Sequence, residues 1–291
     1  MKHVFVLASA LLMSSAAYAQ PEGQAQPPPD EEYDMPSEGY PSNFTQRPIT
    51  LPAMTIKADL GFAVVHFGEV IDSLVLMNLG GAFGILDDLE VGASGDRQGL
   101  QRTSVNGLVP LVLAPDFDIG DIYLYGRYRF LNTGTFQMGV EIGFNIPTFT
   151  DFGFLVAAPF RLRLGEMFSL DGGIEFLTSL GDPDSLSNPD TTFALRTTIQ
   201  PRFAPVDFLY FGVDFGLAST FTNSKALTIA LGFEAGYVID LDTVKIDAYL
   251  NFSFPTLYGS FDTGPSGREG TTVPEFWQLL IGARAFIGLD H

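Results

Sequence analysis

Several segments that are otherwise apolar and aromatic contain charged residues, and the charged residues of such a segment lie an even number of positions apart. Between residues 121 and 147, Arg127 and Arg129 stand on either side of an aromatic residue, and Glu141 lies among aliphatic residues. Carboxyl groups in pairs can act as general acid and base, whereas guanidinium groups bind carboxylates and other anions. Which chemistry applies depends on the elements that hold these side chains.

Enzyme chemistry is disfavoured by the residue types that the chain lacks. The three histidines are His3, His66 and His291, and the chain has no cysteine. A Ser–His hydrolase would depend on His66 alone, and the sequence FGEV after it contains no serine. The acidic residues are interleaved with arginines, a pattern that braces a wall with ion pairs rather than forming a catalytic dyad. We expect no enzyme activity, no catalytic residue and no cofactor.

An acidic loop at residues 182–190, DPDSLSNPD, is the candidate for a metal site. Its carboxylate and amide oxygens suit Ca²⁺, but their spacing is not that of an EF-hand loop or a nonapeptide repeat. We therefore expect a solvated loop without a metal ion.

The elements that position the charged residues are predicted to be β-strands. Successive side chains of a strand point to opposite sides, so alternating charged and apolar residues form two separate faces. No helical period competes with this alternation after residue 19. We predict twelve strands, with approximate spans of 54–67, 75–84, 89–95, 120–131, 136–147, 152–164, 167–180, 191–204, 208–221, 226–239, 243–255 and 276–289.

The polar face of these strands carries nearly balanced charge, so most of its charges can pair across neighbouring strands. Its basic residues are Lys57, Arg127, Arg129, Arg161, Arg163, Arg196, Arg202, Lys245 and Arg284. Its acidic residues are Asp59, Glu90, Glu141, Asp171, Glu175, Asp214, Glu234 and Asp247. The predicted pairs are Arg127 and Arg129 with Glu141, and Arg161 and Arg163 with Asp171 and Glu175.

The N-terminus has the layout of a secretory signal peptide. Lys2 precedes an apolar run over residues 4–13, and Ala-Tyr-Ala at 17–19 fits a small-x-small cleavage site. Residues 1–19 are therefore expected to be removed after export. Residues 20–50 are acidic and rich in proline, and we expect them to form a disordered or extended periplasmic arm. A plug or a cell-wall contact is the less favoured alternative for this arm.

The composition points to a membrane protein without a spanning helix. The formal net charge is −19, which disfavours a nucleic-acid partner. The mean hydropathy is +0.21, yet no apolar run reaches the roughly 18–20 residues of a membrane helix. An exported chain this apolar is typical of a membrane β-barrel.

The connections between the predicted strands sort by length, as in outer-membrane barrels with an even strand number and both termini in the periplasm. The even-numbered connections are tight, at residues 85–88, 132–135, 165–166, 205–207 and 240–242. Most odd-numbered ones are longer, including 95–119, 181–190 and 256–275. Within the first of these long loops, the apolar sequence LVPLVLAP (108–115) either extends the barrel as a strand, which we favour, or folds inward as a constriction.

A soluble β-sandwich is the alternative architecture. It would pack the apolar faces together and expose the charges, but it gives no reason for sorted loops or for aromatic residues near both strand ends. We therefore predict an all-β, transmembrane antiparallel up-and-down barrel of about twelve strands over residues 51–291. Its apolar face meets lipid and its charged face lines a lumen.

Two segments resemble a known family. GILDDLEVGAS (84–94) and DIGDIYLYGRYRF (118–130) are similar to a turn-and-strand and a strand of Gram-negative outer-membrane transporter-like barrels associated with meta-pathway phenol degradation. Ile119 stands where that family usually has glycine, and Tyr125-Gly126 is an addition. Gly282, Ala285 and Ile287 partly fit the spacing of a barrel-assembly signal. The resemblance implies transport and insertion by the barrel-assembly machinery.

These features together predict a channel or transporter of the bacterial outer membrane that passes small molecules through a charged lumen. The alternative is a closed structural or surface-binding barrel without conduction. The expected partners are outer-membrane lipid and lipopolysaccharide, the barrel-assembly machinery, and a small solute that the sequence does not identify.

Overall fold

The computed structural model of the chain describes residues 40–67, 73–94, 111–114, 118–119, 122–146, 152–180, 191–221, 226–241, 243–261, 271–272 and 276–289. The predicted signal peptide, residues 20–39 of the predicted arm and the acidic loop at 182–190 lie outside these residues. Among the described residues, no helix is long and apolar enough to cross a membrane.

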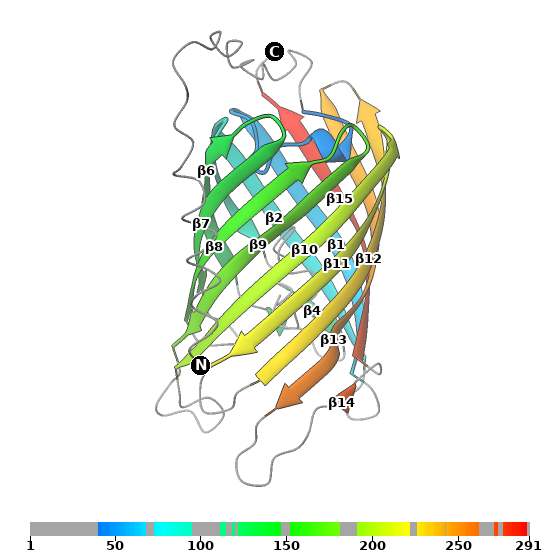
Figure 1. The fold of residues 1–291 in the computed structure, drawn as a ribbon. Coiled ribbons are helices and arrows are strands. Elements are labelled where there is room, and N and C mark those ends of the chain that lie inside the picture. Colours follow the sequence, from blue (N-terminus) through cyan, green and yellow to red (C-terminus); the bar gives the residue numbers. More distant parts are fainter. Residues whose placement is uncertain are drawn as a thin grey trace, which may run out of the picture. The chain divides into compact units, whose positions relative to one another are not determined.

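Twelve strands form a wall within the described residues (Figure 1). They are β1 (Thr55–Phe67), β2 (Leu74–Leu86), β3 (Leu89–Ser94), β6 (Ile122–Asn132), β7 (Phe136–Ile146), β8 (Gly153–Arg163), β9 (Phe168–Ser179), β10 (Thr192–Val206), β11 (Leu209–Thr220), β12 (Ala226–Leu241), β13 (Val244–Phe261) and β15 (Phe276–Gly288). The shorter elements are the 3₁₀ turn η1 (Phe44–Gln46), β4 (Leu111–Ala114), β5 (Asp118–Ile119) and β14 (Thr271–Thr272).

The wall closes on itself through antiparallel pairing. Neighbouring wall strands pair in chain order, and β1 pairs with both β2 and the last strand, β15. The β1–β15 seam runs without interruption from Thr55 opposite Gly288 to Phe67 opposite Phe276. The prediction of a closed, twelve-stranded antiparallel barrel is confirmed.

The long connection after β3 contributes to the wall. Strand β3 has only 6 residues and pairs with the second half of β2, from Gly80 to Leu86. The first half of β2 pairs with β4 instead, and β4 pairs in turn with β5. The apolar sequence around residues 111–114 is therefore a strand extension of the sheet, as favoured from the sequence.

Side chains alternate between a buried inward face and an exposed outward face. In β8, every second residue from Gly153 to Arg163 is buried. The outward positions carry large apolar side chains that remain exposed, such as Ile142, Ile174 and Phe233 at 52%, 54% and 48%. A continuous apolar belt of this kind is stable against acyl chains rather than water.

The two ends of the barrel differ in their connections. At one end, here called the turn end, tight turns at 87–88, 133–135, 164–167 and 207–208 join the strands. Gly134 and Gly165 have φ angles of 75° and 87° there, a left-handed conformation that glycine adopts without strain. The opposite end, here called the loop end, is where the described parts of strands such as β1, β3 and β9 stop, at Phe67, Ser94 and Ser179.

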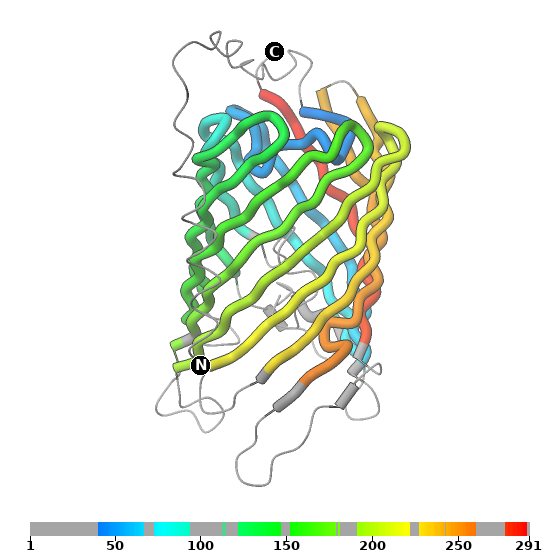
Figure 2. The backbone as a smooth tube through the Cα atoms, in the orientation of Figure 1, coloured from blue at the N-terminus to red at the C-terminus, as the bar shows by residue number. Residues whose placement is uncertain are grey.

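Residues 40–53, here called the N-terminal segment, lie inside the barrel at the turn end (blue in Figures 1 and 2). Their contacts reach several sides of the wall, including Asp247 of β13, Arg161 of β8 and Glu90 of β3. The solvated arm predicted over residues 20–50 is therefore wrong for residues 40–50. Composition suggested solvation there, but Thr45 and Arg47 are buried among wall side chains.

Candidate functional site

The charged side chains predicted to line the lumen lie on the inward positions of their strands. All of them are buried except Arg127, which is partly exposed. Buried charges are stable only when they are paired or hydrogen-bonded. Their partners therefore decide what the interior can do.

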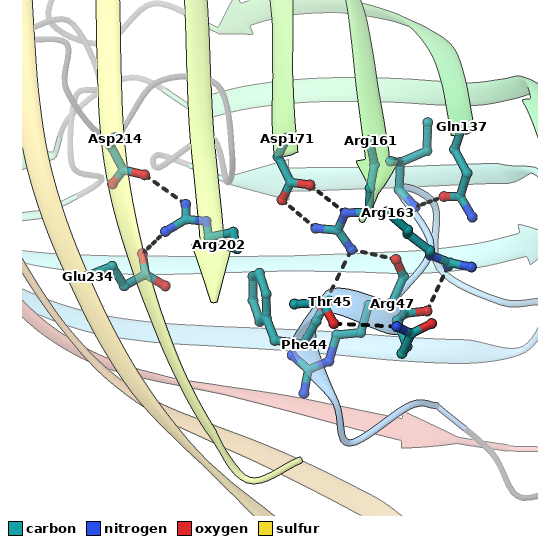
Figure 3. A network of polar contacts seen from close by, with 12 residues as sticks. Phe44, Thr45, Arg47, Gln137, Arg161, Arg163, Asp171, Arg202, Asp214 and Glu234 are labelled. Atoms are coloured by element: carbon teal, nitrogen blue, oxygen red, sulfur yellow. Dashed lines mark hydrogen bonds and ion pairs between the residues drawn. The ribbon is translucent and has the colours of Figure 1, made fainter. Parts of the chain in front are cut away.

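Two of the predicted cross-strand pairs are present, one at the middle of β6 and β7 and the other close to the turn end. Arg127 of β6 bonds to Glu141 of β7 through Nε at 2.9 Å and Nη2 at 2.6 Å, and Glu90 lies 3.2 Å from its Nη1. Arg161 of β8 forms two parallel hydrogen bonds of 2.6 Å with Asp171 of β9 (Figure 3). Such two-point pairs fix the orientation of the guanidinium group.

Two further arginines have partners that the strand pattern did not predict. Arg129 was expected to pair with Glu141, but it bonds to Asp88 at 2.7 Å in the tight turn after β2. Arg163 donates to the carbonyl oxygens of Gly134 and Gln46, at 3.0 and 2.7 Å. Strand alternation relates only residues of neighbouring strands, so it carries no information on partners in the turns or in the N-terminal segment.

A second network joins β10, β11, β12 and β15. Arg202 donates to Asp214 at 2.8 Å and lies 3.7 Å from Glu234 (Figure 3). Arg284 approaches Glu234 at 3.6 Å and Asp59 at 3.8 Å, and it stacks on the ring of Tyr249 at 4.0 Å. These Arg284 distances exceed hydrogen-bond length, so this guanidinium group is held mainly by charge and stacking.

The remaining predicted residues lie around these networks. Lys245 pairs with Asp240 at the turn end, and Arg196 stands directly opposite Glu175 in the β9–β10 register. Asp247 is fully buried and pairs with Arg47 of the N-terminal segment. Arg47 was missed as a site residue, although it is the single basic residue between residues 20 and 50.

Toward the loop end, apolar side chains join polar ones such as Asn78 and Arg196 at the inward positions. Val65, Leu76 and Leu280 form one buried cluster with Ala63 and Tyr249. A second cluster contains Tyr123, Leu155 and Ala157. Sequence alternation assigned apolar residues to the lipid face alone, and these inward residues were therefore missed. The interior consequently has a mainly charged tier near the turn end and, beyond it, a mixed tier that contains the apolar clusters.

A cavity of about 120 Å³ lies between the N-terminal segment and the wall. The segment contributes Phe44 and Arg47 to its lining, and the wall contributes Lys57, Arg202 and Arg284. The described interior is thus narrowed chiefly by a separate stretch of chain rather than by its own wall.

His66 is the histidine of the described residues, and it lies apart from the charged side chains. His66 Nδ1 lies 3.0 Å from Ser73 Oγ, and the contact is exposed at the loop end, away from the charged tier. No group of three or more histidine, cysteine or acidic side chains that could hold a metal is present in the described ranges.

Comparisons with known proteins agree on the fold. The sequence matches no protein-family model and no curated protein. The structure is similar to the COG4313 outer membrane channel from Pseudomonas putida F1, with a TM-score of 0.51 and 12% identity, over 82% of this chain and 97% of that one. It is also similar to the NanC porin, with a TM-score of 0.51 and 10% identity, over 78% and 98% of the two chains. The fold is therefore that of outer-membrane channel barrels.

Proposed function

We propose that the chain is an outer-membrane channel that passes small solutes through the barrel interior, with its turn end toward the periplasm. The signal-peptide layout, the apolar outward belt and the likeness to channel and porin barrels support this location and role. The sequence resemblance to transporter-like barrels points the same way.

The proposal rests on one observation: the barrel wall encloses a space wide enough to hold a peptide. The N-terminal segment fits inside with the ring of Phe44 and the guanidinium group of Arg47, and both contact the wall without belonging to it. In a closed structural barrel, the wall side chains would fill the interior themselves. The bore is therefore at least as wide as an extended chain.

The two tiers of the interior favour a small solute with an apolar part and a polar or charged part. The apolar clusters around Leu155 and Leu280 would contact the first part. The arginine and carboxylate networks would form, with the polar or charged part, the hydrogen bonds that water forms with it in solution. Because basic and acidic residues are nearly balanced, we expect only weak selectivity between anions and cations.

Planar-bilayer recording tests the proposal. The refolded protein is recorded both intact and as a barrel that begins at Leu51. Stepwise current from the shortened barrel supports a channel. A shortened barrel that is folded, as shown by its strand circular dichroism and heat-dependent gel mobility, but carries no current would favour the closed structural alternative.

A further inference from the structure

We propose that the turn end of the lumen is a binding site for an extended peptide, and that residues 40–50 of the chain occupy it as a removable plug. The site itself is argued from contacts alone. Its consequence, control of passage, rests on the proposed channel function.

The wall recognises the backbone of the N-terminal segment. Arg127 and Arg163 donate to the carbonyl oxygens of Ile49 and Gln46, at 2.8 and 2.7 Å. Arg161 donates to the carbonyl oxygen of Arg47. These arginine side chains satisfy the backbone carbonyl groups of the segment, as the amides of a neighbouring strand do in a β-sheet.

A wall acceptor completes the backbone recognition. The amide of Ile49 donates to Gln137 Oε1 at 2.9 Å. Carbonyls and an amide of one short stretch are thus both satisfied by side chains (Figure 3). A site of this kind accepts a peptide rather than a single ion.

Side chains of the segment supply the specific anchors. Phe44 stacks on Tyr210 with ring centroids 4.2 Å apart, and Tyr40 stacks on Phe286 at 4.3 Å. Arg47 engages both carboxylate oxygens of Asp247, and the two side chains are only 3% and 0% exposed. An arginine flanked by aromatic rings at this spacing would distinguish the segment from other peptides.

The arrangement also permits the segment to leave. Residues 40–54 belong to no strand, and the chain has no cysteine that could tie them to the wall. If Arg47 departs, Asp247 still has Arg284 directly opposite it on β15. Arg284 makes no hydrogen bond through Nε or Nη2 within the described structure, so it can take over the carboxylate. Release therefore leaves Asp247 beside a cation, which it shares with Glu234 and Asp59, rather than fully isolated.

Peptide binding in trans tests the site independently of conduction. A fluorescein-labelled peptide of residues 40–50, YPSNFTQRPIT, is titrated with the refolded barrel that begins at Leu51, and anisotropy reports binding. We expect saturable binding, and a scrambled peptide of the same composition should not bind. Because the buried pair is lost, the peptide with Arg47→Ala should bind about tenfold or more weakly.

A mutant cycle locates the contact. The Asp247→Ala barrel should lose a similar factor with the natural peptide, and it should lose little more with the Arg47→Ala peptide, because each change removes the same pair. Independent, multiplying losses, or binding equal to that of the scrambled peptide, would overturn the assigned site.

Current recording then tests the plug. The barrel beginning at Leu51 should conduct more than the intact chain, and the natural peptide should restore the block. Peptide binding without any current in either barrel would leave the site intact but refute the channel function. Equal current in both barrels would refute the plug.

A second variant serves if the shortened barrel does not fold. Ser42 Oγ lies 2.5 Å from Asp240 Oδ2, so Ser42→Cys with Asp240→Cys can tie the segment to the wall in the full chain. Oxidation should hold the current at its lowest level, and reduction should release it. Open events that persist unchanged in the oxidised protein would contradict a removable plug.

Discussion

At the scale of single residues, Arg47 shows how the interior holds a charge away from water. Burial by itself would lower its pKa. The charge and hydrogen bonds of Asp247 outweigh that effect, so the pKa of Arg47 lies above its ordinary value. Arg47 therefore stays charged at neutral and moderately alkaline pH. Any titration of the N-terminal segment must come from another group.

Tyr40 is that group. Burial raises its pKa to about 12, with Arg47 and Arg161 opposing the rise. In the free peptide, tyrosine titrates near pH 10, so above that pH the unbound form loses a proton that binding must restore. We expect the affinity of the natural peptide for the shortened barrel to fall about tenfold per pH unit between pH 10 and 12.

The matched control is the peptide with Tyr40→Phe. Lysine and backbone effects at high pH act equally on both peptides, so the ratio of their affinities isolates Tyr40. Anisotropy titrations from pH 8 to pH 11.5 give this ratio. A ratio that stays constant would mean that Tyr40 is solvated when bound.

At the scale of the strands, inward tyrosines lie over glycines of the neighbouring strand. Tyr123 covers Gly143, and Tyr210 covers Gly236; at either glycine, an added Cβ would fall within 2.5 Å of the ring. These contacts let an aromatic ring lie flat against the wall and protect the backbone beneath it. Tyr210 is fully buried in this position and carries Phe44 on its other side.

We therefore expect Gly236→Ala to lower the free energy of unfolding by about 1–3 kcal/mol, because Tyr210 must move. Urea titration of the refolded barrel in lipid, followed by tryptophan fluorescence, measures the change. Gly126→Ala is the control, since the nearest atom to its added Cβ is 4.0 Å away. Equal effects at the two positions would show that the ring contact is not what requires glycine.

The strands themselves could be predicted from sequence because their signal is local. Alternation gave most boundaries to within a few residues, and it gave pairs such as Arg161 with Asp171, which face each other on neighbouring strands. The predicted strand boundaries were less accurate where a strand contains a proline or its pairing shifts register. Strand β13 continues to Phe261, past Pro255, and its pairing with β12 shifts register between Ile229 and Leu231.

The N-terminal segment could not be predicted in this way. Arg47 and Asp247 are 200 residues apart, and no periodic pattern connects them. A short segment with proline and few large apolar residues has the composition of a solvated tail, since its own chain buries little. It is ordered because the barrel supplies its partners. Only the lone basic residue in an acidic stretch hinted at a buried carboxylate elsewhere.

At the scale of the whole molecule, the medium that the outward face meets, lipid or water, determines the free energy that a charged side chain costs there. Ile142 and Leu164 are similarly exposed, at 52% and 57%, but Ile142 lies in the middle of β7 and Leu164 follows β8 at the turn end. In a lipid-facing belt, the cost of an arginine depends on depth. In water, two equally exposed sites would tolerate it equally.

We expect Ile142→Arg to lower the free energy of unfolding in lipid by about 2–4 kcal/mol, and Leu164→Arg by about 0–1 kcal/mol. Reversible urea unfolding in phospholipid vesicles gives both values. If the two substitutions cost the same, the outward face does not lie across a hydrocarbon layer.

The seam between β1 and β15 has a consequence for biogenesis. It joins the earliest and latest wall strands along their full lengths, so a nascent or nicked product without residues 276–288 cannot close the ring. Such a product would present the free edges of β1 and β13, which invite aggregation or attack by proteases. The barrel therefore closes only in translation products that include β15, and shorter products remain open sheets.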